Sequence, residues 1–456
     1  MKKIKLFNPF LLMLVLALFL AGSCKEDSRF NTSDNDTRVT GAPTNVSWKP
    51  LNGGARIHYT IPPDENLLRV DAEYINKKGK TVYFTTSFYN DSIDVYGFWD
   101  TEPKKVKLYG VNRSGVRSQP YELKDIIPLE PAVLKVAETL VVKPAFNAFY
   151  VDWKNELKQN INVYVNFKYT DNRGFNDINI VFSSKEAKDR KWIKSLRIDP
   201  SVDIDVTLKV EDQYGNITDA IPWGTINLMR DFQLDKSKFK IPNANDSTVV
   251  TRSGRVNSGV PAMYGENVEG RMAKLIDGSI DRWENLNFFH TGGRGRTGTT
   301  IQGRQDNNDW NIIIDLGGYY RLSRIVVNQR HSGNRANTDR GHFYRDENSG
   351  QFRLYVYNET IMRWDTITHQ MFVTPPAVNE LDWVKYGEAG DEALFYPNDP
   401  KYTVPTRWFR YETVANFGVK RLLGTLPGDF NKDGKLILQN SGANCMSEMT
   451  IFGLEE

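Results

Sequence analysis

The chain has 456 residues, which is too long for one ordinary domain and predicts about three. Hydrophobic residues make up 40% and charged residues 25%, a balance typical of soluble folded domains. With 59 basic and 56 acidic residues the formal net charge is only +3, so charge gives no reason to expect nucleic acid as a partner. The aromatic content of 12% suits β-sheets and also supplies flat rings for sugars.

Residues 1–23 are expected to be a signal peptide and are left out of the fold. Three lysines lie within the first five residues, and the apolar run 11–20 is too short to span a membrane comfortably. Small residues then lead to Cys24, a pattern that resembles a bacterial lipobox. Cys24 and Cys445 are the only two cysteines, so the body of the mature chain cannot form an internal disulfide. A cysteine at position 24 is then of little use to an exported protein unless it is lipidated, and we expect Cys24 to be lipidated. The alternative is an ordinary signal peptide followed by a chance cysteine.

Residues 24–40 are predicted to be a flexible tether, because they are rich in Asn, Asp, Ser and Thr and have almost nothing to bury. The run Lys25-Glu26-Asp27 resembles the export tag that sends lipoproteins to the outer face of the outer membrane in glycan-foraging Gram-negative bacteria. That resemblance implies a lipid anchor in the outer membrane, with the chain facing the cell exterior. A merely solvated charged run is the alternative.

Two β-sandwiches are predicted next, at residues 41–128 and 129–230. Residues 55–61 alternate between apolar and polar side chains, and turn signals recur about every ten residues. The stretch 206–215 repeats the pattern of 106–115 at a spacing that matches one sandwich. The order resembles fibronectin type III domains. Neither sandwich carries a catalytic constellation, so both are interpreted as spacers.

The third predicted domain covers residues 231–456, and its clearest element is the stretch 309–318. Residues 312–314 are three isoleucines, bounded by polar residues and by Gly317-Gly318, which predicts one buried strand that ends in a turn. Further segments fall in the order of one known family: 273–278, 321–330, 352–357, 408–412 and 447–453.

This order resembles the discoidin, or coagulation-factor type C, domain over about the last half of the chain. The family includes the family 32 carbohydrate-binding modules and has a galactose-binding-like jelly-roll fold. The fold class is therefore expected to be all-β, with two immunoglobulin or fibronectin-like sandwiches followed by a jelly roll. The resemblance implies binding, and we expect no enzyme activity.

Several sequence signals of enzymes or metal sites fail. There is no metal-ligand pair of histidines at helical spacing, no cysteine cluster and no nucleophile elbow. Residues 293–298 match a dinucleotide fingerprint in letters only, because no strand precedes them and no good helix start follows. Residues 429–434 match the first six positions of an EF-hand calcium loop. The twelfth position is Asn440, which cannot supply the bidentate carboxylate of such a loop, and an Asp-Gly hairpin turn accounts for the same residues.

A structural calcium ion is implied by the family resemblance. Many type C domains hold calcium with an aspartate of the first loop, nearby loop oxygens and a glutamate of the final strand. The matching residues are Asp277 and Glu448, with Asp281 as a third contributor. Carboxylate oxygens suit a hard cation. An apparent insertion at 281–286 interrupts the loop of the remaining ligands, so a solvated acidic loop is the alternative.

Glycan binding is the second implication of the resemblance. The family binds sugar through loops at one end of the jelly roll, and the matching residues are Phe288, His290, Arg330 and Asn334. Arg and Asn suit vicinal hydroxyls because they form paired hydrogen bonds, while an aromatic ring covers the C–H face of a sugar. The sequence leaves open which ring stacks on the sugar: Phe288, Trp310, Tyr344 or Trp364.

The expected function is that of a cell-surface lipoprotein that binds polysaccharide or oligosaccharide, accessory to its capture or uptake. Expected partners are glycan, the outer membrane through the lipid, and outer-membrane uptake proteins. One alternative is a non-catalytic adhesion protein whose jelly roll contacts another protein. A glycoside hydrolase is a further alternative, although no carboxylate pair stands out in an apolar setting.

Overall fold

The computed structural model describes these parts of the chain: residues 38–242, 272–282, 286–290, 310–331, 340–345, 348–417 and 444–456. Antiparallel sheets make up almost all of its regular structure, so the prediction of an all-β chain is confirmed. Cys24, Lys25-Glu26-Asp27 and Asn334 lie outside the described residues. Within the described part, no helix has the length and apolar character needed to cross a membrane.

The chain divides into two compact units. The first runs to Lys143 and also includes Tyr150–Trp192 and Asp203–Ile226. The second consists of Pro144–Phe149, Ile193–Val202 and Asn227–Glu456.

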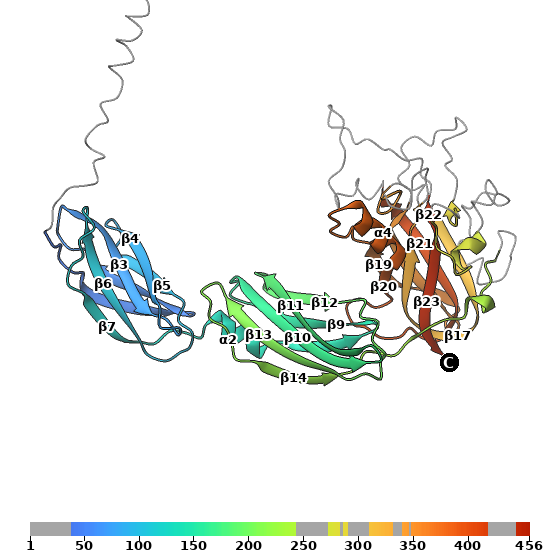
Figure 1. Ribbon diagram of the computed structural model, residues 1–456, viewed down its shortest axis with the longest axis horizontal. Coiled ribbons are helices and arrows are strands. Elements are labelled where there is room, and N and C mark those ends of the chain that lie inside the picture. The colour runs from blue at the N-terminus through green and yellow to red at the C-terminus, as the bar shows by residue number, and fades with distance from the viewer. Residues whose placement is uncertain are drawn as a thin grey trace, which may run out of the picture. The chain divides into compact units, whose positions relative to one another are not determined.

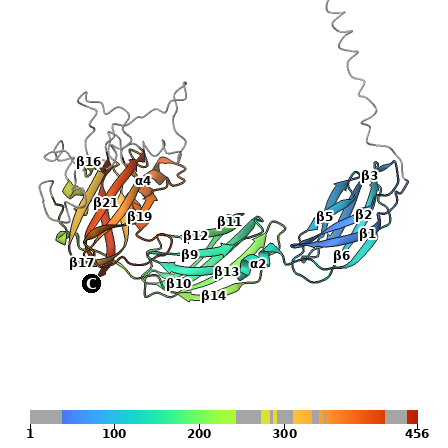
Figure 2. The same ribbon diagram turned by 180° about the vertical axis from the view of Figure 1, so that it is seen from behind.

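The first sandwich consists of a three-stranded and a four-stranded sheet (Figure 1, Figure 2). The sheet order is β1-β2-β5 in one and β4-β3-β6-β7 in the other. Buried and exposed side chains alternate along β2 and β6, which places one side of each sheet in a shared apolar core. The strands are β1 (Thr44–Leu51), β2 (Gly54–Thr60), β3 (Leu67–Ile75), β4 (Thr81–Ser87), β5 (Ser92–Tyr96), β6 (Lys104–Asn112) and β7 (Tyr121–Ile126).

The second sandwich repeats this plan with the sheets β12-β9-β8 and β11-β10-β13-β14. A short helix, α2 (Ala132–Glu138), precedes it and starts after Pro131, its N-cap residue, whose backbone is extended. The strands are β8 (Val141–Ala145), β9 (Ala148–Lys154), β10 (Ile161–Asp171), β11 (Gly174–Ser184), β12 (Lys188–Ile193), β13 (Ile204–Asp212) and β14 (Ile221–Ile226).

The C-terminal jelly roll has a larger sheet of order β15-β23-β17-β21-β18-β19, with β20 paired to β17 and a separate pair β16-β22. Its core is rich in aromatic rings, among them Phe352, Phe409 and Tyr411. The elements are β15 (Phe232–Gln233), η2 (Lys236–Lys238), η3 (Met272–Leu275), β16 (Phe289–His290), β17 (Trp310–Asn328), β18 (Ser349–Asn358), β19 (Arg363–Met371), α4 (Glu380–Ala389), β20 (Asp391–Leu394), β21 (Thr406–Asn416), β22 (Cys445–Met446) and β23 (Glu448–Glu455).

Strand β17 differs from the expectation of a short strand that ends at the double glycine. Its 19 residues pass through Gly317 and Gly318, with a register irregularity between Asp315 and Tyr320. The first half pairs with β21, and the second half lies between β23 and β20. Gly317 has φ +74°, and a Cβ there would lie 2.4 Å from the Lys238 carbonyl oxygen. The glycine thus makes a local kink where the sequence pattern predicts a turn.

Helix α4 was not predicted, although its start has a recognisable sequence signal. Asn379 and Asp382 form a reciprocal capping box, in which each side chain accepts from the backbone N–H of the other residue.

A buried ion network holds one edge of the jelly roll. Arg324 of β17 donates to Asp231 at 2.9 Å and to Glu392 of β20 at 3.1 Å, and all three side chains are at least about nine-tenths buried. The Arg324 guanidinium also lies 3.6 Å from the ring centroid of Phe452. Burial raises the pKa of Glu392, while Arg324 opposes that rise. One guanidinium therefore compensates two buried carboxylates.

We predict that Arg324→Met lowers the free energy of unfolding by about 3–5 kcal/mol, because it leaves both carboxylates buried without their cation. Chemical denaturation of the purified protein measures this change. The control is Arg321→Met, three residues earlier in β17, where the guanidinium pairs with Glu456 and both side chains are exposed. The control should melt like the wild type, and equal losses in the two variants would contradict the prediction.

Candidate functional site

Of the residues assigned to glycan binding, Phe288, the His290 backbone and Arg330 lie at one end of the jelly roll. Strand β16 pairs with β22, with Phe289 opposite Met446 and His290 opposite Cys445. Asn348 forms a further bridge with Cys445. Figure 1 shows β22 and α4 at this end of the domain, and Figure 2 shows β16 and α4 there. Segments far apart in the sequence are thus brought side by side.

Asn348 fixes the backbone of Arg330 from both sides. The Arg330 N–H donates to Asn348 Oδ1 at 2.8 Å, and Asn348 Nδ2 donates to the Arg330 carbonyl oxygen at 3.0 Å. The same amide group donates to the His342 carbonyl oxygen at 2.7 Å, and the Asn348 carbonyl oxygen accepts from Phe417 N–H at 2.8 Å. Asn348 is 1% exposed, so water cannot readily replace these bonds.

The Arg330 side chain lies over an aromatic ring. Its guanidinium carbon is 4.2 Å from the ring centroid of Phe288, and Nη1 lies 3.6 Å from Cys445 Sγ. Stacking engages the face of the guanidinium, whereas its N–H donors lie in the plane of the group. Phe288 is only 3% exposed, so its ring supports Arg330 in this arrangement and is not an open surface for a sugar.

The other residues assigned from the sequence are placed only in part. The structure describes the backbone of His290 and Trp310 but not their side chains. Tyr344 is buried, with its hydroxyl 3.0 Å from Asp391 Oδ1, which suits a structural role. Trp364 is partly exposed on β19 and packs edge-on against Tyr357 at 5.5 Å. The identity of the stacking ring stays open.

Sequence reasoning missed Asn348, Cys445 and Trp383 at this end. Trp383 is a partly exposed ring on α4, 5.6 Å from Tyr344, and the Arg340 guanidinium lies 3.8 Å from its centroid. The capping box could have revealed α4 and therefore this tryptophan. Nothing in the local sequence distinguishes Asn348 from other loop asparagines, because its side chain bonds backbone groups of Arg330 and His342 that only the fold places around it.

Each of the three carboxylates assigned to calcium accepts N–H donors. Asp277 Oδ1 accepts from Ser279 N–H at 2.9 Å and from Asn287 Nδ2 at 3.1 Å. Asp281 Oδ2 accepts from His331 N–H at 2.8 Å. Glu448 accepts from the Lys236 ammonium group and from Gly278 N–H at 3.3 Å. A donor therefore points at one oxygen of each aspartate and at both oxygens of Glu448.

The described residues do not fit a calcium site in this arrangement. In the described ranges, no three Asp, Glu, His or Cys side chains are grouped so that they could hold one metal ion. The pKa of Glu448 is raised to about 7, mainly by burial and in smaller part by the nearby Asp277, against the opposing effect of Lys236. Calcium binding stays a prediction of the resemblance.

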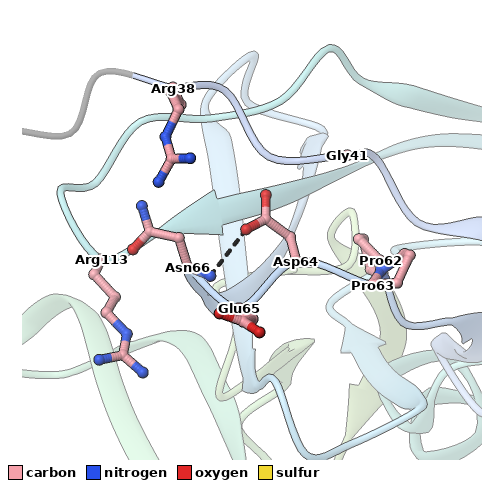
Figure 3. A pocket seen from close by; sticks show the side chains of 8 residues that line it. All are labelled: Arg38, Gly41, Pro62, Pro63, Asp64, Glu65, Asn66 and Arg113. Carbon is pink, nitrogen blue, oxygen red and sulfur yellow. Dashed lines mark hydrogen bonds between the residues drawn. The ribbon is translucent and has the colours of Figure 1, made fainter.

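A separate pocket of about 760 Å³ lies in the first sandwich. Its charged lining residues are Arg38, Arg113, Asp64 and Glu65, two basic and two acidic groups. Figure 3 shows the Arg38 and Arg113 guanidinium groups on different sides of Asn66, with Arg113 directed away from Arg38. The charges balance and the basic groups do not converge, so we assign no ligand to this pocket.

Two protein-family models match the chain, and both are described only as domains of unknown function. DUF4959 matches residues 40–128, and DUF5126 matches residues 129–229. No curated protein matches the sequence.

Several solved structures show distant similarity. A SusE-like protein matches 72% of this chain over 100% of its own, with 16% identity and a TM-score of 0.32. The module CBM32-5 from Clostridium perfringens, in complex with GalNAc-β-1,3-galactose, matches 48% of this chain over 99% of its own, with 13% identity and a TM-score of 0.25. Two fibronectin type III domains of chicken tenascin match 41% of this chain over 99% of their own, with 13% identity and a TM-score of 0.20. Similarities this distant carry no functional argument.

We predict that Asn348→Ser lowers the free energy of unfolding by about 1–3 kcal/mol, because it leaves partly buried backbone groups of Arg330 and His342 without their partner. Hydrogen exchange should accelerate at Arg330 more than at the centre of β17. The control is Asn358→Ser at the other end of β18, where the partly exposed side chain donates to Asp365 at 3.1 Å. Unchanged exchange at Arg330 would show that Asn348 does not hold it.

Proposed function

We propose that the chain is a lipid-anchored protein of the bacterial cell surface that binds glycan through the Arg330 end of its jelly roll. The observation that carries the proposal is the placement of Arg330. Asn348 brackets its backbone, Phe288 supports its guanidinium, and the β16-β22 pair lies beside it.

The chemistry of this placement suits a sugar. A guanidinium presents several N–H donors in one rigid plane, and vicinal hydroxyls of a sugar ring present acceptors at a matching spacing. Because the Arg330 guanidinium already lies against Phe288 and Cys445, less side-chain entropy remains to be lost on binding. A partly exposed ring near this end, such as Trp383, would cover the C–H face of the sugar.

Asn334 and the His290 side chain belong to the proposed site on the strength of the resemblance alone. The solved CBM32-5 module with its disaccharide has a ligand of the proposed class, but its TM-score is too low to support the proposal. The proposal is supported instead by the contacts around Arg330 and by the family signature in the sequence.

Anchoring is proposed from the sequence at Cys24, with Lys25-Glu26-Asp27 as the export tag. Acyl chains on Cys24 would hold the chain in the outer membrane, since two or more chains anchor stably where one does not. The tether 24–40 and the two sandwiches would then act as spacers. Outer-membrane uptake proteins are the proposed partners, and the proposed role is to capture glycan for them.

We predict that Arg330→Ala weakens glycan binding by about 1–3 kcal/mol, or roughly 5- to 150-fold in Kd, because ligand hydroxyls lose their partners. Arg330→Lys should lose most of the same affinity, since an ammonium group cannot present a planar fork. A glycan array identifies the ligand, and isothermal titration calorimetry on the purified protein gives the affinities.

The matched control for this experiment is Arg363→Ala, which removes an exposed arginine of β19 that pairs with Asp365 at 3.2 Å. It should bind like the wild type. Equal affinity of Arg330→Ala and wild type would contradict the proposed site. Binding to a protein partner, with no binding to any glycan on the array, would favour the adhesion alternative. Release of a cleaved sugar from a glycan would favour a hydrolase.

For the anchor, we predict that replacing Lys25-Glu26-Asp27 by three alanines leaves lipidation intact but removes the protein from the cell surface. Protease treatment of intact cells measures surface exposure, and metabolic labelling with a fatty acid measures lipidation. The control is Cys24→Ala, which should lose the label and leave the membrane fraction. A triple variant that stays accessible to protease would refute the tag.

A further inference from the structure

Lys236 occupies a buried position between two segments of the jelly roll. Lys236 is the first residue of η2, which follows β15 in the chain. Strand β15 pairs with β23, with Phe232 opposite Gly453 and Gln233 opposite Phe452. The side chain is 11% exposed, which is unusual for lysine. This placement directs the ammonium group along β23 toward the start of that strand.

The ammonium group is held by two acceptors of β23. It contacts Glu448 Oε1 and donates to Thr450 Oγ1 at 3.0 Å. The Glu448 side chain is 3% exposed, and its other oxygen accepts from Gly278 N–H at 3.3 Å. One carboxylate thus joins three segments that are distant in sequence: the entry segment at Lys236, the loop at Gly278 and the last strand.

A metal ion bound to Asp277 and Glu448 would make the same connection between the first loop and the last strand. Here an amine supplies the positive charge from within the chain. Asp277 and Asp281 accept N–H donors, and the described residues contain no group of three carboxylate, imidazole or thiolate side chains placed for a metal. The Lys236 ammonium group therefore supplies the positive charge, and Glu448 links the first loop to the last strand, without a metal ion.

We infer that Lys236 is an internal cation that replaces structural calcium in this jelly roll. The domain then depends on the Lys236–Glu448 ion pair for the attachment of β23 and does not depend on calcium. Since a buried carboxylate without a partner is strongly unfavourable, removal of the amine alone should cost more than removal of both charges. This inference is independent of the proposed glycan site.

The experiment compares the purified full-length protein with Lys236→Met and Lys238→Met, in chelator and in millimolar calcium chloride. Lys238 is the matched control, because it lies in the same turn and its ammonium pairs with Glu455 at the exposed surface. Differential scanning calorimetry gives the melting temperature of the jelly roll. Hydrogen exchange of the peptide Glu448–Glu455 gives the local stability of β23.

We expect the wild type and Lys238→Met to melt at the same temperature with chelator and with calcium. Lys236→Met should melt about 5 °C lower or more, with exchange in β23 accelerated about tenfold or more. A wild-type melting temperature that rises with calcium by several degrees would overturn the inference, because it would reveal a bound ion. A Lys236→Met variant as stable as the wild type would overturn it as well.

A second variant covers the case in which Lys236→Met does not fold. Lys236→Met combined with Glu448→Met removes both charges and should fold, with a melting temperature above that of the single variant. A double variant no more stable than the single one would contradict the role of the ion pair.

Discussion

The jelly roll depends on burial of β17 between three partner strands. Ile312 and Ile314 lie in the core where β17 pairs with β21, and Ile325 lies in the core where it pairs with β23 and β20. Every main-chain group of such a strand needs a partner, since buried amides without one are costly. The kink at Gly317 lets one strand pair with β21 in its first half and with β23 and β20 in its second half. Arg324 of β17 compensates the charges of the buried carboxylates of Asp231 and Glu392.

The candidate site inherits its rigidity from this strand. Arg330 follows the end of β17 by two residues, and Asn348 precedes β18 by one, so both stand on strand ends and not in the middle of a long loop. Sites on regular elements hold their geometry better than sites on loops. The short distance from the paired residue Asn328 to Arg330 explains how one asparagine can fix the arginine.

The sequence predicted those features that depend on local pattern. Alternation gave the strands of both sandwiches, and the run Ile312 to Ile314 gave a buried strand. Gly317-Gly318 misled the prediction, because a glycine pair marks a turn and a kinked strand equally well. Phe288 and Arg330 were identified from their family positions, but the stacking of one on the other depends on tertiary packing. Lys236 carried no signal because its partner Glu448 lies 212 residues away. Asn348 carried none because its side chain bonds backbone groups that only the fold places around it.

The pairing of β15 with β23 has a mechanical consequence. The chain enters the jelly roll at Phe232, opposite Gly453, whereas Glu448 pairs with Asn328 beside Arg330, at the other end of β23. If a ligand were held at Arg330 while the preceding part of the chain pulled on Asp231, the domain would therefore be stretched along its strands. The β15 bonds and the Leu234 bond to Ile451 would share that load in shear instead of opening one by one. Asp231 is itself held by Arg324 of β17, so that ion pair would share the load from the start, and the Lys236–Glu448 pair would carry it next.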